Sequence, residues 1–119
     1  MADLPGPYSP PAGRLILALQ AGEAIGCVAL RPLDLQTCEM KRLYVRPAFR
    51  GHKLGRTLAS HVIDEAGTIG YATIRLDTSS SMTEAIALYR SLGFTETAPY
   101  NDNPLPGALF FERRLRASG

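Results

Sequence analysis

The sequence predicts a mixed α/β (α+β) fold: a mostly antiparallel sheet with a βαβ unit at its centre and two main helices. Residues 14–45 form short apolar runs separated by turns, helical spacing first appears at Leu54, and strand-like alternation returns after Gly70. A chain of 119 residues with 45% hydrophobic residues suits one domain, since domains most often have about 100–150 residues. We therefore expect a single domain over residues 1–119, with residues 1–13 as an extended, proline-rich leading segment.

The first half of the chain is predicted to be all β. The apolar runs 14–20 and 25–30 lie on either side of a turn at 21–23, which indicates an antiparallel hairpin. Residues 38–45 are predicted to form a third strand, and Pro47 prevents its simple continuation. Strict alternation along this strand would place Glu39, Lys41, Leu43 and Val45 on one face of the sheet.

Helices and strands then alternate. The spacing of the apolar residues predicts a helix over 54–66 that ends at Gly67, followed by a strand over 71–77. A strand, a helix and a strand in this order form a right-handed crossover between parallel strands. Ser81 and Glu84 have capping-box spacing, which predicts a second helix that ends at Gly93. Two closing strands over 94–99 and 108–115 are expected around the turn 101–107.

Composition excludes several classes of protein. Thirteen Lys+Arg against 11 Asp+Glu give a net charge of only +2, which argues against a dedicated nucleic-acid binder. A small basic binder would have to use the local cluster Arg42, Arg46, Arg50, Lys53 and Arg56, without aromatic side chains between them. There is no apolar stretch of the ~20 residues that a membrane span needs, and residues 1–11 lack the core of a signal peptide. Two cysteines and two histidines predict neither a disulfide framework nor a metal site, so we expect a cytoplasmic protein without a metal and without a membrane or nucleic-acid partner.

The loop before the first helix carries the strongest chemical signal. Gly51 and Gly55 allow close approach of a ligand to the backbone, and a helix N-terminus offers free N–H groups and a partial positive charge. Formal positive charge comes from Arg50, His52, Lys53 and Arg56. This combination favours a phosphate or pyrophosphate group. Taken alone, however, the loop favours an ordinary basic helix cap, because Gly and Arg are common in loops.

Two motifs together resemble the GNAT superfamily of acetyl-coenzyme A-dependent N-acetyltransferases. The first is the run 50–55, which reads Arg-Gly-His-Lys-Leu-Gly, and the second is Ala-Ile-Ala-Leu-Tyr at 85–89 followed by Gly93-Phe94. The chain departs from the family pattern at Lys53, where a glycine is usual, and at Met82, where an asparagine is frequent. The resemblance covers about residues 14–115. It implies a sheet of the GNAT type and acetyl-coenzyme A as the co-substrate.

The resemblance also implies a set of site residues. The coenzyme would be held by the main chain of Leu43 and Val45 and by Arg50, Gly51, His52, Lys53, Leu54, Gly55 and Arg56. Tyr89 would be the general acid that protonates the leaving thiolate, because a phenol with a pKa of about 10 is protonated at neutral pH. Glu39 would be the general base, although it could equally form a salt bridge with Lys41 or Arg42. Without the resemblance, Tyr89 would be interpreted as a helix residue that covers the sheet edge.

The acceptor is predicted to be a small-molecule or peptide primary amine that attacks the thioester directly, since no cysteine occupies a motif position. Tyr100, Asn101 and Asn103 would contact this substrate, although turn formers alone explain their presence. The alternative function is a non-catalytic acyl-coenzyme A-binding or partner-dependent module. GNAT proteins usually begin with a strand and two helices before the hairpin, so we expect a natural short form, a misplaced start codon, or a homodimer in which the partner supplies that wall.

Overall fold

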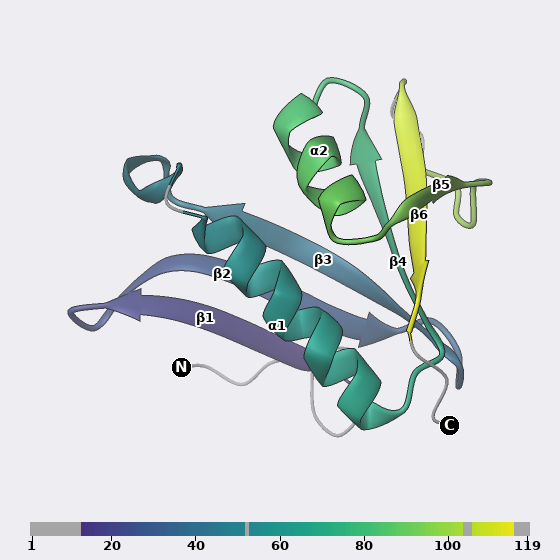
Figure 1. Ribbon diagram of the computed structural model, residues 1–119, viewed down its shortest axis with the longest axis horizontal. Helices are drawn as coiled ribbons and strands as arrows, with labels where there is room; N and C mark the ends of the chain where they lie inside the picture. Colours follow the sequence, from purple (N-terminus) through teal and green to yellow (C-terminus); the bar gives the residue numbers. More distant parts are fainter. Residues whose placement is uncertain (1–12, 52, 104–105, 116–119) are drawn as a thin grey trace.

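A computed structural model describes residues 13–51, 53–103 and 106–115 of the chain (Figure 1). Most of the predicted leading segment, residues 1–12, lies outside the described residues. The first half contains β1 (Arg14–Gln20), β2 (Glu23–Pro32), β3 (Thr37–Val45) and a 3-10 turn (Pro47–Phe49). The second half contains α1 (Leu54–Ile69), β4 (Thr73–Ser79), α2 (Thr83–Ser91), β5 (Thr95–Thr97) and β6 (Ala108–Arg114).

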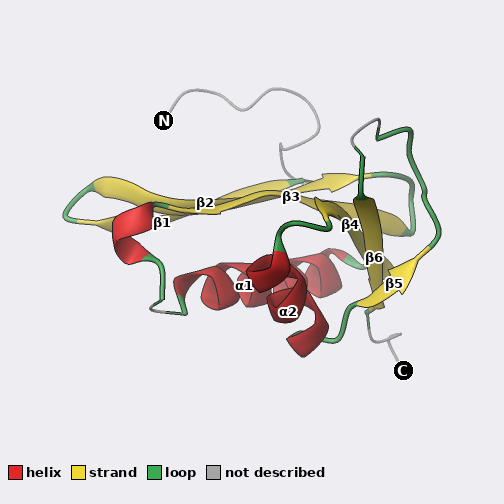
Figure 2. Ribbon diagram, turned by 90° about the horizontal axis from the view of Figure 1, so that it is seen from above, coloured by secondary structure: helices red, strands yellow, loops and turns green. Residues whose placement is uncertain are grey.

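The strands form one sheet in the order β1-β2-β3-β4-β6-β5. Only β3 and β4 are parallel, and every other pair of neighbours is antiparallel. The mixed, mostly antiparallel sheet and the central βαβ unit are therefore confirmed. Figure 2 shows that α1 and α2 both lie on one face of this sheet, which we call the helix face; the other is the open face.

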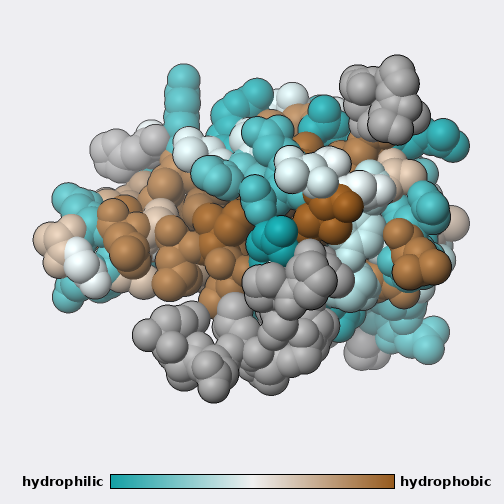
Figure 3. Space-filling model, turned by 90° about the horizontal axis from the view of Figure 1, so that it is seen from below, coloured by the Kyte–Doolittle hydropathy of each residue, from teal (hydrophilic) through white to brown (hydrophobic). Residues whose placement is uncertain are grey.

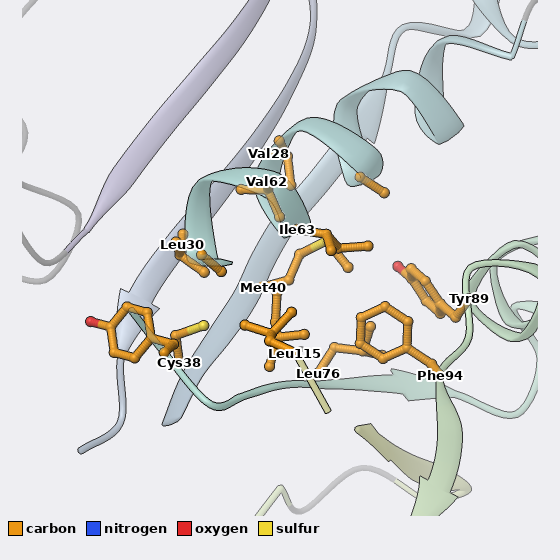
Figure 4. Close-up of a cluster of buried hydrophobic side chains, with 14 of the residues drawn as sticks. Val28, Leu30, Cys38, Met40, Val62, Ile63, Leu76, Tyr89, Phe94 and Leu115 are labelled. Carbon is orange, nitrogen blue, oxygen red and sulfur yellow. The ribbon is translucent and has the colours of Figure 1, made fainter. Parts of the chain in front are cut away.

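The hydrophobic core lies between the sheet and α1. Leu58, Val62 and Ala66 of α1 are buried against side chains of the central strands, among them Val28 and Met40 (Figure 4). Burial of each large apolar side chain contributes about 1.5–3 kcal/mol. The helical spacing of the apolar residues in the sequence therefore identifies the face of α1 that packs on the sheet.

Two helix boundaries differ from the predictions. Helix α1 continues through Gly67 to Ile69 and ends at Gly70, whose φ of +114° is a left-handed conformation that glycine adopts without strain. The predicted capping box at Ser81 is absent, because the N-cap of α2 is Met82 and has no side-chain hydrogen bond. The Ser81 hydroxyl instead forms a hydrogen bond with the Ser79 hydroxyl at 2.9 Å.

A β-bulge at Arg42 corrects the predicted alternation of β3. Arg42 has a φ of +59°, and the pairing of β2 with β3 shifts register between Cys27 and Ala29. Leu43 and Val45 consequently pack against the core on the helix face, whereas Glu39 and Lys41 contact polar side chains on the open face. One extra residue reverses the face of every side chain beyond it, and alternation alone could not reveal that residue.

Candidate active site

The two parallel strands at the centre of the sheet separate after a short pairing. Strands β3 and β4 pair only from Thr37 and Thr73 to Glu39 and Arg75. Beyond that pair they diverge, which Figure 1 shows as a widening gap beneath α2. We call the opening between residues 40–45 of β3 and residues 76–79 of β4 the fork. Among the described strands, β3 has no partner on its β4 side along the fork, so main-chain groups there are available to a ligand. The part of β3 along the fork includes Leu43 and Val45, whose main chain was expected to hold the coenzyme.

The N-terminus of α1 lies next to the end of β3. Its N-cap, Lys53, has a φ of 62°, and no side chain caps the helix there. The first intrahelical bond runs from the Thr57 N–H to the Lys53 carbonyl, at 3.0 Å. Earlier N–H groups of the helix have no intrahelical acceptor and can donate to an anion. Gly51, with a φ of +85°, has no atoms within 4 Å of the position that a Cβ would take, so its surroundings are open.

The basic side chains of this loop have different local partners. Arg50 donates from Nε to the Val45 carbonyl at 2.8 Å and lies 5.5 Å from the centre of the Tyr44 ring. Arg56 donates to the Ser91 hydroxyl of α2 at 2.7 Å. Lys53 is exposed, and His52, the remaining predicted contact, lies outside the described residues. Arg50 therefore connects the loop to β3, and Arg56 connects it to α2. Both arginines also add positive charge to the loop.

Gly55 and Leu54 occupy the first turn of α1 between the strand and the second helix. A Cβ on Gly55 would lie 3.8 Å from Val45 Cγ2 and 3.8 Å from Leu88 Cδ2, both ordinary contact distances. The position thus lies between the end of β3 and α2, at the open end of the fork, which we call its mouth. A methyl group would therefore fit there without a clash with the protein. The Leu54 side chain packs against the core.

Tyr89 lies on the helix face of the sheet. It is 8% exposed and packs edge-on against Phe94 with ring centres 5.9 Å apart. Figure 4 shows its hydroxyl directed from α2 towards Ile63 of α1. Burial raises the pKa of Tyr89 above its usual value, so the phenol is protonated at neutral pH.

Glu39 lies on the open face, where β3 and β4 begin to separate. Its side chain is fully buried and accepts hydrogen bonds from Arg31 Nε at 2.7 Å and from the Tyr100 hydroxyl at 2.6 Å. Lys41 Nζ lies 3.6 Å from the second carboxylate oxygen. The salt bridge with Lys41 that the sequence left as an alternative is therefore present. Burial and the neighbouring Glu39 carboxylate raise the pKa of Tyr100, which keeps its hydroxyl a donor.

The structure adds Asp77 and Lys41, which the sequence did not identify as site residues. Asp77 Oδ2 accepts hydrogen bonds from the amides of Asn101 and Asn103, each at 3.1 Å, and Lys41 Nζ lies 3.3 Å from Asp77 Oδ1. Burial alone would raise the pKa of Asp77, but the two amides and the Lys41 ammonium lower it. The predicted substrate residues are thus brought beside the fork. Lys41 and Asp77 each lie two residues beyond Glu39 and Arg75, the last paired residues of β3 and β4. This equal spacing could have indicated that the two side chains lie close together.

Two further kinds of feature were searched for in the described residues. No helix in residues 13–51, 53–103 or 106–115 is long and apolar enough to cross a membrane. The same part of the chain contains no group of three or more His, Cys, Asp or Glu side chains that could hold a metal ion.

Comparison with known proteins identifies the family. Residues 3–94 match the model of the acetyltransferase (GNAT) family. An uncharacterized N-acetyltransferase of Schizosaccharomyces pombe is 44% identical over 110 residues, which cover 91% of this chain and 68% of that protein. The ribosomal-protein-S18-alanine N-acetyltransferase of Escherichia coli superposes with a TM-score of 0.79 at 28% identity, covering 94% of this chain and 75% of that one.

A second similar structure contains a ligand. A GNAT acetyltransferase of Elizabethkingia anophelis with acetyl-coenzyme A bound has a TM-score of 0.76 and 29% identity, over 87% of this chain and 77% of that one. The fork, the uncapped helix beside it and these similarities all indicate the same family. The chain belongs to the acetyltransferase (GNAT) family and is a GNAT-type acyltransferase.

Proposed function

We propose that this protein is an acetyl-coenzyme A-dependent N-acetyltransferase that transfers the acetyl group to a primary amine by direct attack. The single observation that carries the proposal is the fork, with the uncapped N-terminus of α1 at its mouth. Acetyl-coenzyme A supplies an activated acetyl thioester when it is bound. The N–H groups of residues 54–56 would hold its pyrophosphate, and main-chain N–H groups of β3 at Leu43 and Val45 would bind its extended arm.

The two faces of the sheet separate the chemical roles. On the helix face, Tyr89 would give its proton to the thiolate as the C–S bond breaks, and the raised pKa keeps that proton available at neutral pH. A main-chain N–H at the bulge of β3 would donate to the carbonyl oxygen as its negative charge develops. The amine would approach from the open face, where Tyr100, Asn101 and Asn103 lie beside the opening.

Glu39 is the candidate general base from the sequence, but its contacts favour another role. Both of its oxygens already accept short hydrogen bonds, from Arg31 and from Tyr100. Both oxygens are therefore engaged, and the side chain is fully buried, so the carboxylate is not exposed to an incoming amine. We propose that Glu39 positions Tyr100, and that water at the open face accepts the proton of the amine.

A transfer assay tests the proposed function. The protein is incubated with acetyl-coenzyme A and a panel of amines: a polyamine, an aminoglycoside, several free amino acids and a peptide that begins with alanine. The peptide is included because one relative is named for acetylation of an alanine of a ribosomal protein. Acetylated product is measured by mass spectrometry, since the half-buried Cys27 thiol would add a background to a thiol reagent. Turnover of at least one amine is expected.

The non-catalytic module is the alternative outcome. Tight binding of coenzyme A in a calorimeter without turnover of any amine would support an acyl-coenzyme A-binding module and contradict the proposed enzyme. Absence of both binding and turnover would contradict the assignment of the coenzyme site itself.

A homodimer is the proposed assembly. Strand β1 is at one end of the sheet, and its outer edge has no partner among the described strands. Leu17 and Leu19 on this strand are 38% and 61% exposed, and Figure 3 shows apolar surface gathered at that end of the molecule. Exposed edges of this kind pair readily with another strand. Sedimentation velocity should show a dimer that Leu19→Lys converts to a monomer; a wild-type monomer would contradict this proposal.

A further inference from the structure

We propose that Lys41 is a positioning residue for the acceptor amine, because it joins the two carboxylates that hold residues 100–103 beside the fork. The inference rests on the proposed function, since it concerns the side from which the amine would approach. It adds to that function a residue on the open face of the sheet, opposite the helix face where Tyr89 packs. The residues that act together are Arg31, Glu39, Lys41, Asp77, Tyr100, Asn101 and Asn103.

Lys41 spans the fork on its open face. Its Nζ lies 3.6 Å from Glu39 Oε2 on β3 and 3.3 Å from Asp77 Oδ1 on β4. Main-chain pairing between these strands ends at Glu39 and Arg75, so the contact with Asp77 connects the strands where no hydrogen bond of the sheet does. The side chains of Lys41 and Asp77 are only 29% and 12% exposed. Water therefore screens this ion pair less than it screens a fully exposed pair.

Each carboxylate holds a different part of the segment 100–103. Glu39 Oε2 accepts from the Tyr100 hydroxyl at 2.6 Å, and Asp77 Oδ2 accepts from the amides of Asn101 and Asn103 at 3.1 Å each. The Asn103 N–H also donates to the Asn101 side-chain oxygen at 2.9 Å, which fixes the turn between them. The segment is thus connected to both strands through two acidic groups.

Lys41 places a positive charge between the two acids, with its Nζ 3.6 Å from Glu39 Oε2 and 3.3 Å from Asp77 Oδ1. Arg31 compensates Glu39 on its other oxygen, at 2.7 Å. Asp77 has Lys41 as its ion-pair partner, and its remaining donors are neutral amides. Without the ammonium, two carboxylates would face each other across the fork and repel. The acceptor-side segment would then lose at least one of its anchors.

The test compares Lys41→Met, which keeps the aliphatic stem, with Lys41→Arg, which keeps the charge. The control is Glu96→Gln, which breaks the Arg90–Glu96 pair, whose side chains are 54% and 51% exposed. Hydrogen exchange of residues 98–103 is measured by mass spectrometry, the dissociation constant of coenzyme A by calorimetry, and KM and kcat with an amine that the wild-type protein acetylates.

In Lys41→Met we expect exchange in residues 98–103 to be about tenfold faster. The KM for the amine should rise about tenfold, while kcat and coenzyme A affinity change by about twofold or less. Lys41→Arg should recover most of both effects, and Glu96→Gln should show neither.

Two results would overturn the proposal. The first is unchanged exchange of residues 98–103 in a folded Lys41→Met protein. The second is an equal rise in KM for acetyl-coenzyme A and for the amine, which would indicate a general structural effect. A wild-type protein that acetylates no amine would instead overturn the proposed function, and the exchange rates would then decide alone whether Lys41 anchors the segment.

Discussion

At the scale of single residues, the two side chains first proposed as acid and base lie on opposite faces of the sheet. Tyr89 belongs to the hydrophobic cluster under the helices, whereas Glu39 belongs to the polar network of the open face. In this arrangement the leaving thiolate would face the helix side of the sheet, and the attacking amine would face the open side. The fork connects the two faces, because β3 and β4 form no main-chain hydrogen bonds with each other along it.

Tyr89→Phe tests the acid. The substitution removes only the hydroxyl, so the packing against Phe94 should remain. We expect kcat to fall about a hundredfold, within the range for loss of a general acid, while coenzyme A affinity changes by less than about twofold. Tyr71→Phe is the matched control, because Tyr71 is also buried, at 6% exposed, but follows the other end of α1. Steady-state kinetics and calorimetry make the comparison; an unchanged kcat in Tyr89→Phe would show that Tyr89 only covers the sheet.

At the scale of secondary structure, the site depends on how one strand and one helix end. The bulge at Arg42 turns Leu43 and Val45 towards α1, and the 3-10 turn then leads the chain to the N-terminus of α1. Arg50 holds this connection by donating to the Val45 carbonyl. The uncapped first turn is therefore fixed at the mouth of the fork, where its free N–H groups can receive an anion.

Gly55→Glu tests this arrangement at the first turn of α1. The new carboxylate would extend from a position that faces Val45 and Leu88 at the mouth of the fork. Its negative charge should weaken coenzyme A binding at least about tenfold, or about 1.4 kcal/mol. Glutamate in the first turn favours the helix, so the protein should stay folded.

The matched control for this variant is Gly67→Glu. It makes the same change of charge in the same helix, at a glycine with nothing within 4 Å of the position that a Cβ would take. Calorimetry with coenzyme A, together with circular dichroism, compares the two variants. Equal affinities in two folded proteins would remove the phosphate site from this loop.

At the scale of the whole molecule, burial decides which groups keep their protons to a higher pH. Burial raises the pKa of Cys38 from 9.0 to about 12, and it also raises the pKa values of Tyr71, Tyr89 and Tyr100. In each case the folded protein holds its proton to a higher pH than the unfolded chain does. These groups therefore stabilise the fold fully below their unfolded pKa values, and the contribution is lost as the pH rises towards the folded values.

The free energy of unfolding should therefore fall between pH 9.0 and about 12. Cys38 is the first of these groups to titrate in the unfolded chain, and one proton corresponds to a slope of about 1.4 kcal/mol per pH unit. Urea unfolding at several pH values measures the slope. Cys38→Ala should flatten the first part of the fall, whereas Cys27→Ala, at the half-buried cysteine, should retain it. The same slope in both variants would show that Cys38 is not responsible.

Much of the fold could be predicted because local rules agree with the tertiary structure. The spacing of Leu58, Val62 and Ala66 identified the buried face of α1, and the order of strand, helix and strand required β3 and β4 to be parallel. The glycine that ends α1 could not be chosen from the sequence, because Gly67 and Gly70 are both suitable. The helix continues past Gly67 at a cost of about 1 kcal/mol, and Gly70 supplies the left-handed cap.

The fold class, the place of the basic loop before α1 and the position of Tyr89 on α2 could all be predicted from the amino-acid sequence, since each depends on residues close together in the chain. The partners of Glu39 and the network around Lys41 required the folded structure, because those contacts join residues up to 61 positions apart. The face that each side chain of β3 occupies required it as well. That outcome depends on a single bulged residue, Arg42, whose left-handed backbone cannot be predicted from the periodicity of the sequence. The bulge changes the face of every side chain that follows it in the strand.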